Sequence, residues 1–176
     1  MFARTERLLL RPGWVEDAPA LAQAINREDV AINLAHVPYP YSVADARTFL
    51  NADRAADETN LLIFERTSAE PRLIGGIGLA RSAGQAILGY WIVPSSWGKG
   101  FATEAGRAVI DLARETLRIG QLKAQHFVDN PASGRVLRKL GFAATGERES
   151  MFSAGRNATS PGLSYRLDLN ATGLTA

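Results

Sequence analysis

The chain is predicted to fold as an α+β domain built around a mixed β-sheet. Apolar runs rich in β-branched residues recur along the chain, and amphipathic segments with helix-capping residues lie between them. The two kinds of segment alternate without an internal repeat, a linker or a low-complexity region. The length of 176 residues suits one domain, residues 1–176, that buries a substantial core.

The first half of the chain predicts two capped helices and three strands. Asp17 is expected to cap the first helix, and Ser42 is expected to cap the second. Two prolines prevent a regular helix over His36–Tyr41. The strands expected in this half are Arg7–Arg11, Leu61–Arg66 and Leu73–Ala80.

The second half predicts two helices and four strands. A helix with apolar residues three and four apart begins at Phe101, and Gly120 is expected to terminate it. Asn130 caps the next helix, which ends at Gly141. The strands expected here are Ala86–Val93, Leu122–Val128, Glu147–Phe152 and Leu163–Leu169.

Composition excludes several kinds of site. The chain has no cysteine, which rules out disulfides, thiolate metal sites and cysteine nucleophiles. Only His36 and His126 could supply imidazole, so no metal is expected. The net charge of +2 is small and demands no nucleic acid. No signal peptide or membrane span is expected, and the cytoplasm is the default location.

Two glycines, Gly98 and Gly100, separate an apolar strand from the helix that begins at Phe101. This order is typical of phosphate binding, because glycines let the backbone approach and the helix N–H groups attract an anion. A P-loop would need a hydroxyl residue in place of Gly100, and a dinucleotide site would need Gly or Ala in place of Thr103. Taken alone, the glycines are equally well explained by a tight turn.

Three segments together resemble the GNAT superfamily of acyl-CoA-dependent N-acyltransferases. They are Gly89–Trp91, Trp97–Ala105 and Asn130–Phe142, and they are most similar to the Rim-type branch of ribosomal-protein-alanine N-acetyltransferases. Weaker likeness extends from Arg7–Arg11 to Tyr165–Leu167. The resemblance implies a mostly antiparallel mixed sheet flanked by helices. Its two central parallel strands splay apart, and acyl-CoA lies between them.

The resemblance also implies acetyl-CoA as the co-substrate. Backbone groups of Ile92 and Val93 would pair with the pantetheine amides, and either N–H could stabilise the oxyanion. Ser95 replaces the usual first motif residue, so main-chain groups are expected to bind the pyrophosphate. Lys99 and Lys139 could contact CoA phosphate, although solvated charges explain both residues better. The residues expected at the cofactor are Ile92, Val93, Trp97, Gly98, Lys99, Gly100, Phe101, Ala102, Asn130, Ser133 and Lys139.

The catalytic residues implied by the resemblance are Ser133, Asn130 and Glu149. Ser133 would protonate the departing thiolate, and Asn130 would lie near the pantetheine arm. Many relatives carry a general-base glutamate where this chain has Ile87. Some Rim-type relatives place a carboxylate later in the chain, where Glu147 and Glu149 are both candidates.

The acceptor side is the least constrained part of the chain. Tyr39 and Tyr41 would cover the acceptor pocket, although aromatic residues there could simply pack the loop. The segment Ser153–Gly162 is expected as a second acceptor loop, and His126 as a core histidine.

The expected activity is direct transfer of acetyl to a primary amine, with a protein or peptide N-terminal α-amine favoured. Open alternatives are a small-molecule amine acceptor, a CoA-binding module without turnover, and a nucleotide-binding regulator. A monomer and a homodimer are equally compatible with the sequence.

Overall fold

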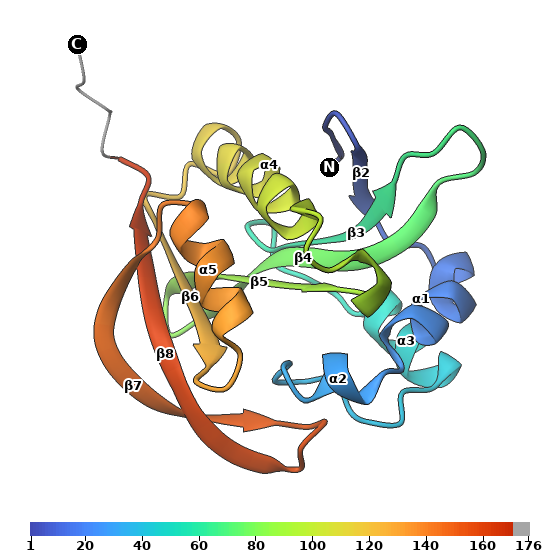
Figure 1. The fold of residues 1–176 in the computed structure, drawn as a ribbon. Helices are drawn as coiled ribbons and strands as arrows, with labels where there is room; N and C mark the ends of the chain where they lie inside the picture. Colours follow the sequence, from blue (N-terminus) through green and yellow to red (C-terminus); the bar gives the residue numbers. More distant parts are fainter. Residues whose placement is uncertain (171–176) are drawn as a thin grey trace.

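In the computed structural model, residues 1–170 are described, and their strands form one eight-stranded sheet flanked by helices (Figure 1). The strand order is β1-β2-β3-β4-β5-β6-β8-β7, and β5 and β6 are the parallel pair. The mixed, mostly antiparallel sheet predicted above is therefore confirmed. Residues 171–176 of the expected domain lie outside the described residues. Within residues 1–170, no helix has the length and apolar character needed to cross a membrane.

The bounds of the elements follow the predicted order. The strands are β1 (Ala3–Arg4), β2 (Leu8–Pro12), β3 (Thr59–Glu65), β4 (Arg72–Ser82), β5 (Gln85–Ile92), β6 (Gln121–Phe127), β7 (Ala143–Ser153) and β8 (Ala158–Asp168). The α-helices are α1 (Ala18–Ile25), α2 (Glu28–Ala31), α3 (Val43–Asn51), α4 (Phe101–Glu115) and α5 (Pro131–Lys139).

The two central strands separate part-way along their length. β5 and β6 pair over three positions, which end at Leu88 opposite Ala124. Beyond that point β5 stays with β4 up to Ile92, while β6 stays with β8 up to Phe127. Because each strand follows its antiparallel neighbour, the pair splays open as the family resemblance implied.

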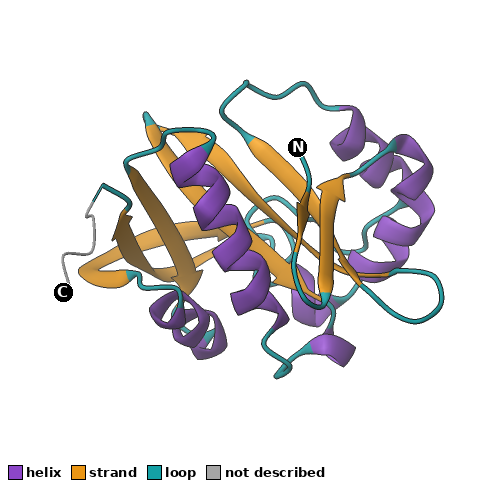
Figure 2. Ribbon diagram, turned by 90° about the horizontal axis from the view of Figure 1, so that it is seen from above, coloured by secondary structure: helices purple, strands orange, loops and turns teal. Residues whose placement is uncertain are grey.

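Two apolar cores hold the sheet between its helices, which lie on both sides of the strands in Figure 2. The larger core buries α4 and α5 against one face, with Val109 and Leu137 at most 1% exposed. The smaller core packs α1 and α3 on the other face, around Leu21 and Leu62. Successive strand residues face opposite sides, so Leu88 joins the larger core and Trp91 packs against the smaller one.

Several local expectations need correction. Asp17 does not cap α1 through its side chain, because its carboxylate binds both terminal nitrogens of Arg11 at 2.7 Å. Helix α4 ends at Glu115, before Gly120. Residues 158–162 belong to β8, so the expected acceptor loop Ser153–Gly162 is mostly paired strand. The short strand β1 and the short helix α2 were not predicted, because neither has a periodic apolar pattern.

Other local expectations are confirmed by the geometry of the helix caps. Ser42 Oγ accepts the N–H of Asp45 at 3.1 Å, and the Asp45 carboxylate accepts the N–H of Ser42 at 2.8 Å. This reciprocal pair is the capping box that starts α3. Asn130 Oδ1 accepts the N–H of Ser133 at 3.2 Å and starts α5.

Candidate functional site

The turn that leads into α4 has the backbone of an anion site. Gly98 and Gly100 adopt φ angles of +74° and +82°, a region that side chains other than glycine rarely occupy. The first helical bond joins the N–H of Glu104 to the carbonyl of Gly100, which leaves the preceding N–H groups without an intrahelical acceptor. A Cβ at Gly98 would meet no atom of residues 1–170 within 4 Å, so open space faces the turn in this part of the chain.

A pocket of about 640 Å³ lies beside this turn. It brings together the start of α4, the end of α5 and the residues before β2, three parts of the chain that are distant in sequence. Lys139, for which a solvated charge was the favoured explanation, lies on its wall with Arg107. The lining residues are Thr5, Glu6, Arg7, Gly100, Thr103, Glu104, Arg107 and Lys139.

The end of β5 corrects one expectation about the backbone donors. The N–H of Val93 donates to the Ile74 carbonyl at 2.8 Å, so it belongs to the ladder with β4. Neighbouring residues of an antiparallel strand direct their N–H groups to opposite sides, which aims the N–H of Ile92 at the splay. Of the two expected oxyanion donors, only the N–H of Ile92 is therefore directed toward the space between β5 and β6.

Trp97 has a role that sequence reasoning did not identify. Its indole Nε1 donates to the Ile92 carbonyl at 2.6 Å, and its side chain remains half exposed. This bond fixes the glycine turn to the last residue of β5. It also uses one of the two acceptor positions of the Ile92 carbonyl, the group that was expected to pair with pantetheine.

A strand tyrosine reaches the first turn of α5. Tyr90 Oη lies 2.7 Å from Ser133 Oγ and 3.3 Å from the Ser133 carbonyl oxygen. Burial raises the pKa of Tyr90 to about 12, which the bond to Ser133 partly opposes and the nearby Tyr165 reinforces. Tyr90 is thus a neutral hydroxyl near pH 7, and it joins the splayed strand to the expected thiolate acid.

Glu149 lies in a polar cluster on β6, β7 and β8. Its carboxylate accepts hydrogen bonds from Lys123 Nζ at 2.7 Å, Gln125 Nε2 at 2.6 Å and Ser164 Oγ at 2.7 Å. The bond from Lys123, followed by that from Ser164, holds the pKa of Glu149 below its ordinary value. A carboxylate stabilised in its charged form is a weaker base than a free one, which disfavours the expected catalytic role.

Three other candidates occupy different environments. His126 is buried, with Nδ1 2.7 Å from the Phe127 carbonyl and Nε2 3.2 Å from Tyr165 Oη, so it is the core histidine expected. Tyr41 is only 7% exposed and packs in the core of α1 and α3, which corrects its expected place at the acceptor. Tyr39 presents its side chain at the surface.

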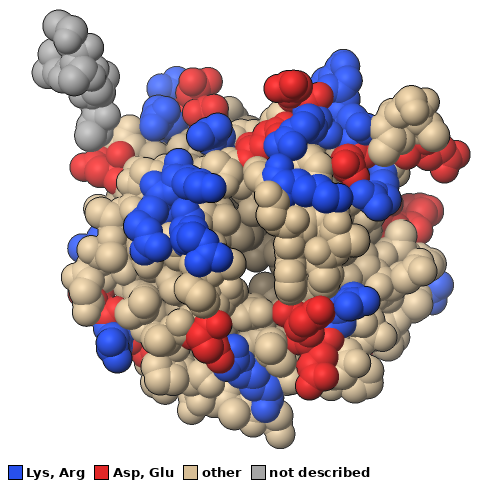
Figure 3. All heavy atoms as spheres, in the orientation of Figure 1, with Lys and Arg blue, Asp and Glu red and all other residues tan. Residues whose placement is uncertain are grey.

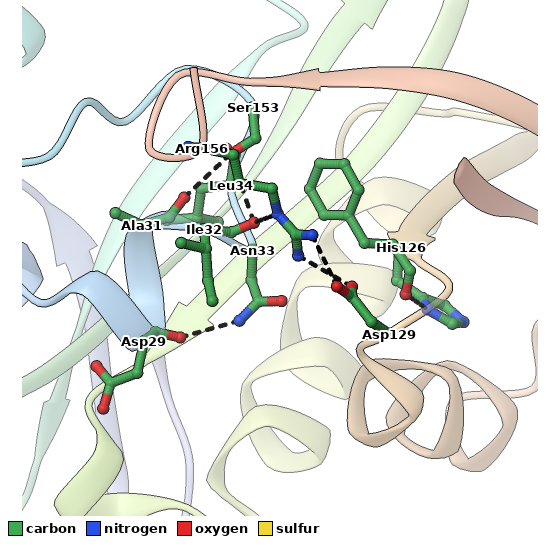
Figure 4. Close-up of polar contacts among 10 residues, drawn as sticks. Asp29, Ala31, Ile32, Asn33, Leu34, His126, Asp129, Ser153 and Arg156 are labelled. Carbon is green, nitrogen blue, oxygen red and sulfur yellow. Dashed lines mark hydrogen bonds and ion pairs between the residues drawn. The ribbon is translucent and has the colours of Figure 1, made fainter. Parts of the chain in front are cut away.

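The hairpin of β7 and β8 is locked to the residues after α2, as Figure 4 shows. Ser153 Oγ donates to the Leu34 carbonyl at 2.9 Å, and Arg156 Nε donates to the Ile32 carbonyl at 2.6 Å. The same guanidinium binds both oxygens of Asp129, directly before Asn130, at 2.7 and 2.9 Å. These bonds connect three loops and support the start of α5.

A hollow passes through the centre of the molecule beside α5 (Figure 3). Lysine and arginine side chains gather on the same face over α5. A central opening with basic side chains near it suits an elongated, anionic ligand.

The comparisons with known proteins agree with this geometry. Residues 7–143 match the family model described as the acetyltransferase (GNAT) domain. The uncharacterized N-acetyltransferase YoaA of Bacillus subtilis (strain 168) is 30% identical over 160 residues, which cover 86% of this chain and 88% of YoaA. The chain therefore belongs to the GNAT acetyltransferase family and has the N-acetyltransferase function of that family.

Solved structures share the fold. A GNAT-family acetyltransferase from Bacillus anthracis has a TM-score of 0.81 at 23% identity, covering 96% of this chain and 99% of its own. RimL, a ribosomal L7/L12 α-N-protein acetyltransferase, has a TM-score of 0.80 at 20% identity, covering 98% and 100%. Spermidine N-acetyltransferase from Vibrio cholerae, solved with CoA and spermine, has a TM-score of 0.77 at 20% identity, covering 94% and 97%. The Rim-type branch is thus one of several neighbours.

Proposed function

We propose that this protein transfers acetyl from acetyl-CoA directly to an N-terminal α-amine. The observation that carries the proposal is the glycine turn at the start of α4, next to the point where β5 and β6 separate. An anion site beside an open strand edge suits a ligand with a pyrophosphate and an amide-bearing arm, which CoA combines. The positive φ angles and the open space at Gly98 fit that ligand.

The site for the pyrophosphate, the cradle, consists of residues 98–102 and would use main-chain groups. N–H groups of Gly98, Lys99, Gly100, Phe101 and Ala102 would bind the pyrophosphate, since the turn and the first helical turn carry uncommitted donors. Lys139 and Arg107, on the wall of the adjacent pocket, would attract the remaining phosphate charge. Trp97 would support the cradle by its bond to Ile92.

The chemistry needs a donor for the oxyanion and a proton for the thiolate. The N–H of Ile92 would stabilise negative charge on the attacked carbonyl, because it points to the splay rather than to β4. Ser133 would protonate the departing thiolate at the start of α5, where Asn130 caps the helix. Transfer would be direct, since the sequence has no cysteine to form an acyl-enzyme.

The acceptor is inferred from the lack of a strong base. An α-amine has an ordinary pKa of about 8 and a lysine amine about 10.4, so the neutral fraction of an α-amine near pH 7 is a few hundred-fold larger. Ile87 replaces the glutamate of many relatives, and Glu149 is tied to Lys123. An amine that is already partly neutral needs the least help from the site to lose its proton. RimL, which acts on a protein α-amine, supports this acceptor class.

The test incubates the protein with acetyl-CoA and a panel of amines and measures the release of free thiol. The panel contains peptides with free N-termini, Nα-blocked lysine peptides and polyamines such as spermidine. Faster release with free N-termini supports the proposal. Preference for polyamines would favour a small-molecule acceptor, and binding of acetyl-CoA without thiol release would favour a CoA-binding module. Binding of ATP without CoA would favour the nucleotide regulator.

A further inference from the structure

The first turn of α4 carries a carboxylate, Glu104, close to the proposed anion cradle. Glu104 follows Gly100 by one helical turn, and its N–H donates the first intrahelical bond to the Gly100 carbonyl. Its side chain is only 18% exposed. A carboxylate favours a helix N-terminus when no ligand is present. The carboxylate also repels a pyrophosphate bound to the N–H groups at the start of α4, because like charges at short range repel each other.

The Glu104 carboxylate is covered by Arg7. Oε2 of Glu104 lies 2.7 Å from Arg7 Nε and 2.6 Å from Arg7 Nη2, while Oε1 accepts the N–H of Arg7 at 3.0 Å. Thr5 Oγ1 also donates to Oε1, at 2.6 Å. Burial alone would raise the pKa of Glu104, but the hydrogen bonds from Thr5 and Arg7 outweigh it and lower the pKa. The carboxylate is therefore charged near pH 7, and its charge is paired.

The remaining donor of Arg7 reaches the glycine turn itself. Arg7 Nη1 donates to the Lys99 carbonyl at 3.0 Å, and the guanidinium lies 4.6 Å above the ring of Phe101. A Cβ at Gly100 would lie 3.6 Å from Arg7 Nη2. One planar guanidinium thus contacts both ends of the turn, which a lysine ammonium could not do with the same geometry.

We propose that Arg7 is a positioning residue of the cradle, which neutralises Glu104 and fixes the Lys99 carbonyl so that the turn can accept pyrophosphate. This inference rests on the proposed function, since it assumes that acetyl-CoA binds at the turn. The inference predicts that the loss of Arg7 alone weakens acetyl-CoA binding more than the loss of Arg7 and Glu104 together. Without Arg7, the Glu104 carboxylate is an unneutralised negative charge near the pyrophosphate. Removing Glu104 as well relieves that repulsion.

The experiment measures acetyl-CoA affinity by calorimetry for the wild type, Arg7→Gln, Glu104→Gln and the double variant. Arg7→Gln is expected to weaken binding at least about 10-fold, the scale of a lost charge-assisted contact. The double variant should recover part of that loss. Arg7→Lys should fall between the wild type and Arg7→Gln. Arg114→Gln is the matched control, because Arg114 lies on α4 with an exposed partner, Asp111, 3.7 Å away.

A second readout separates positioning of the turn from a general loss of structure. S-acetylpantetheine has the thioester and the pantetheine arm but no pyrophosphate, so its kcat/KM should be unchanged in Arg7→Gln. Equal losses with acetyl-CoA and S-acetylpantetheine would overturn the inference, as would a double variant that binds no better than Arg7→Gln. Wild-type protein that does not bind acetyl-CoA would overturn the proposed function as well. If the wild type binds acetyl-CoA and Arg7→Gln binds it equally well, only the inference about Arg7 is overturned.

Discussion

Tyr90 Oη and Ser133 Oγ are 2.7 Å apart, although the two residues lie 43 positions apart in the chain. Tyr90 belongs to β5 at the splay, and Ser133 belongs to the first turn of α5. Ser133 can donate its proton outward when Tyr90 donates to its oxygen. The contact therefore gives the strand a means to orient the hydroxyl that would meet the thiolate.

Ser133→Ala is expected to lower turnover about 10-fold, below the usual range for a general acid because water can replace a hydroxyl. Acetyl-CoA affinity should change little. Tyr90→Phe should lower turnover by a smaller factor, and the double variant should be no slower than Ser133→Ala, because the two hydroxyls act as one unit. Tyr165→Phe is the control, since that hydroxyl bonds to His126. Additive losses in the double variant would contradict the shared role.

Gly100→Ala tests the cradle. A Cβ at this position should weaken acetyl-CoA binding about 10-fold, because the main chain of the turn would approach the pyrophosphate. Gly84→Ala is a matched control: Gly84 also has a positive φ, +75°, with no atom within 4 Å of a Cβ. Both variants should lose similar stability, about 1 kcal/mol. Calorimetry that finds equal affinity in the two variants would remove the turn from the binding site.

The pH dependence of turnover tests the acceptor. With a free-N-terminus peptide, kcat/KM should rise up to about pH 8, the ordinary pKa of an α-amine, and then level off. With an Nα-blocked lysine peptide it should be far lower near pH 7 and keep rising towards about pH 10. Assays of both peptides over this range are decisive. Faster acetylation of the lysine peptide near pH 7 would show that a base compensates for Ile87.

The ion pair of Arg11 and Asp17 should contribute to stability in a pH-dependent way. The hydrogen bond from Arg11 is the main cause that lowers the pKa of Asp17 below its ordinary 3.8, and burial opposes it. A depressed carboxyl pKa stabilises the fold above the unfolded-state pKa, and this stability is lost as the pH falls through the folded-state value. Asp17→Asn should therefore lower the free energy of unfolding by about 2 kcal/mol near pH 7.

Chemical denaturation of Asp17→Asn and wild type over a range of pH measures this contribution. The difference between them should shrink once the pH falls below about 3.9, because the Asp17 carboxyl is then protonated in the unfolded chain and, at lower pH, in the folded protein. Asp29→Asn is the control, since Asp29 pairs with Arg27 at 3.3 Å with both side chains about half exposed. Such an exposed pair should contribute less than the more buried pair of Arg11 and Asp17. A constant difference for Asp17→Asn across this range would argue against the ion pair as its source.

Much of the fold could be predicted because it depends on local chemistry. The caps at Ser42 and Asn130 lie where predicted, since a cap depends on residues only three positions away. The glycines at 98 and 100 were recognisable because few other residues tolerate a positive φ. Asp17 was mispredicted for the opposite reason. Its side chain had two possible partners, and it binds Arg11 on β2 instead of the N–H groups of the nearby helix.

The sequence alone determined the order of the longer strands and helices, the glycine turn and the family, because these are encoded in short segments and their spacing. Only the tertiary structure decided which side chains meet across the fold: Arg7 with Glu104, Tyr90 with Ser133, and Lys123 with Glu149. The same structure assigned Tyr41 to the core and the Val93 N–H to β4. Such pairings depend on sheet register and helix packing, which bring distant residues within hydrogen-bonding distance and which no local pattern specifies.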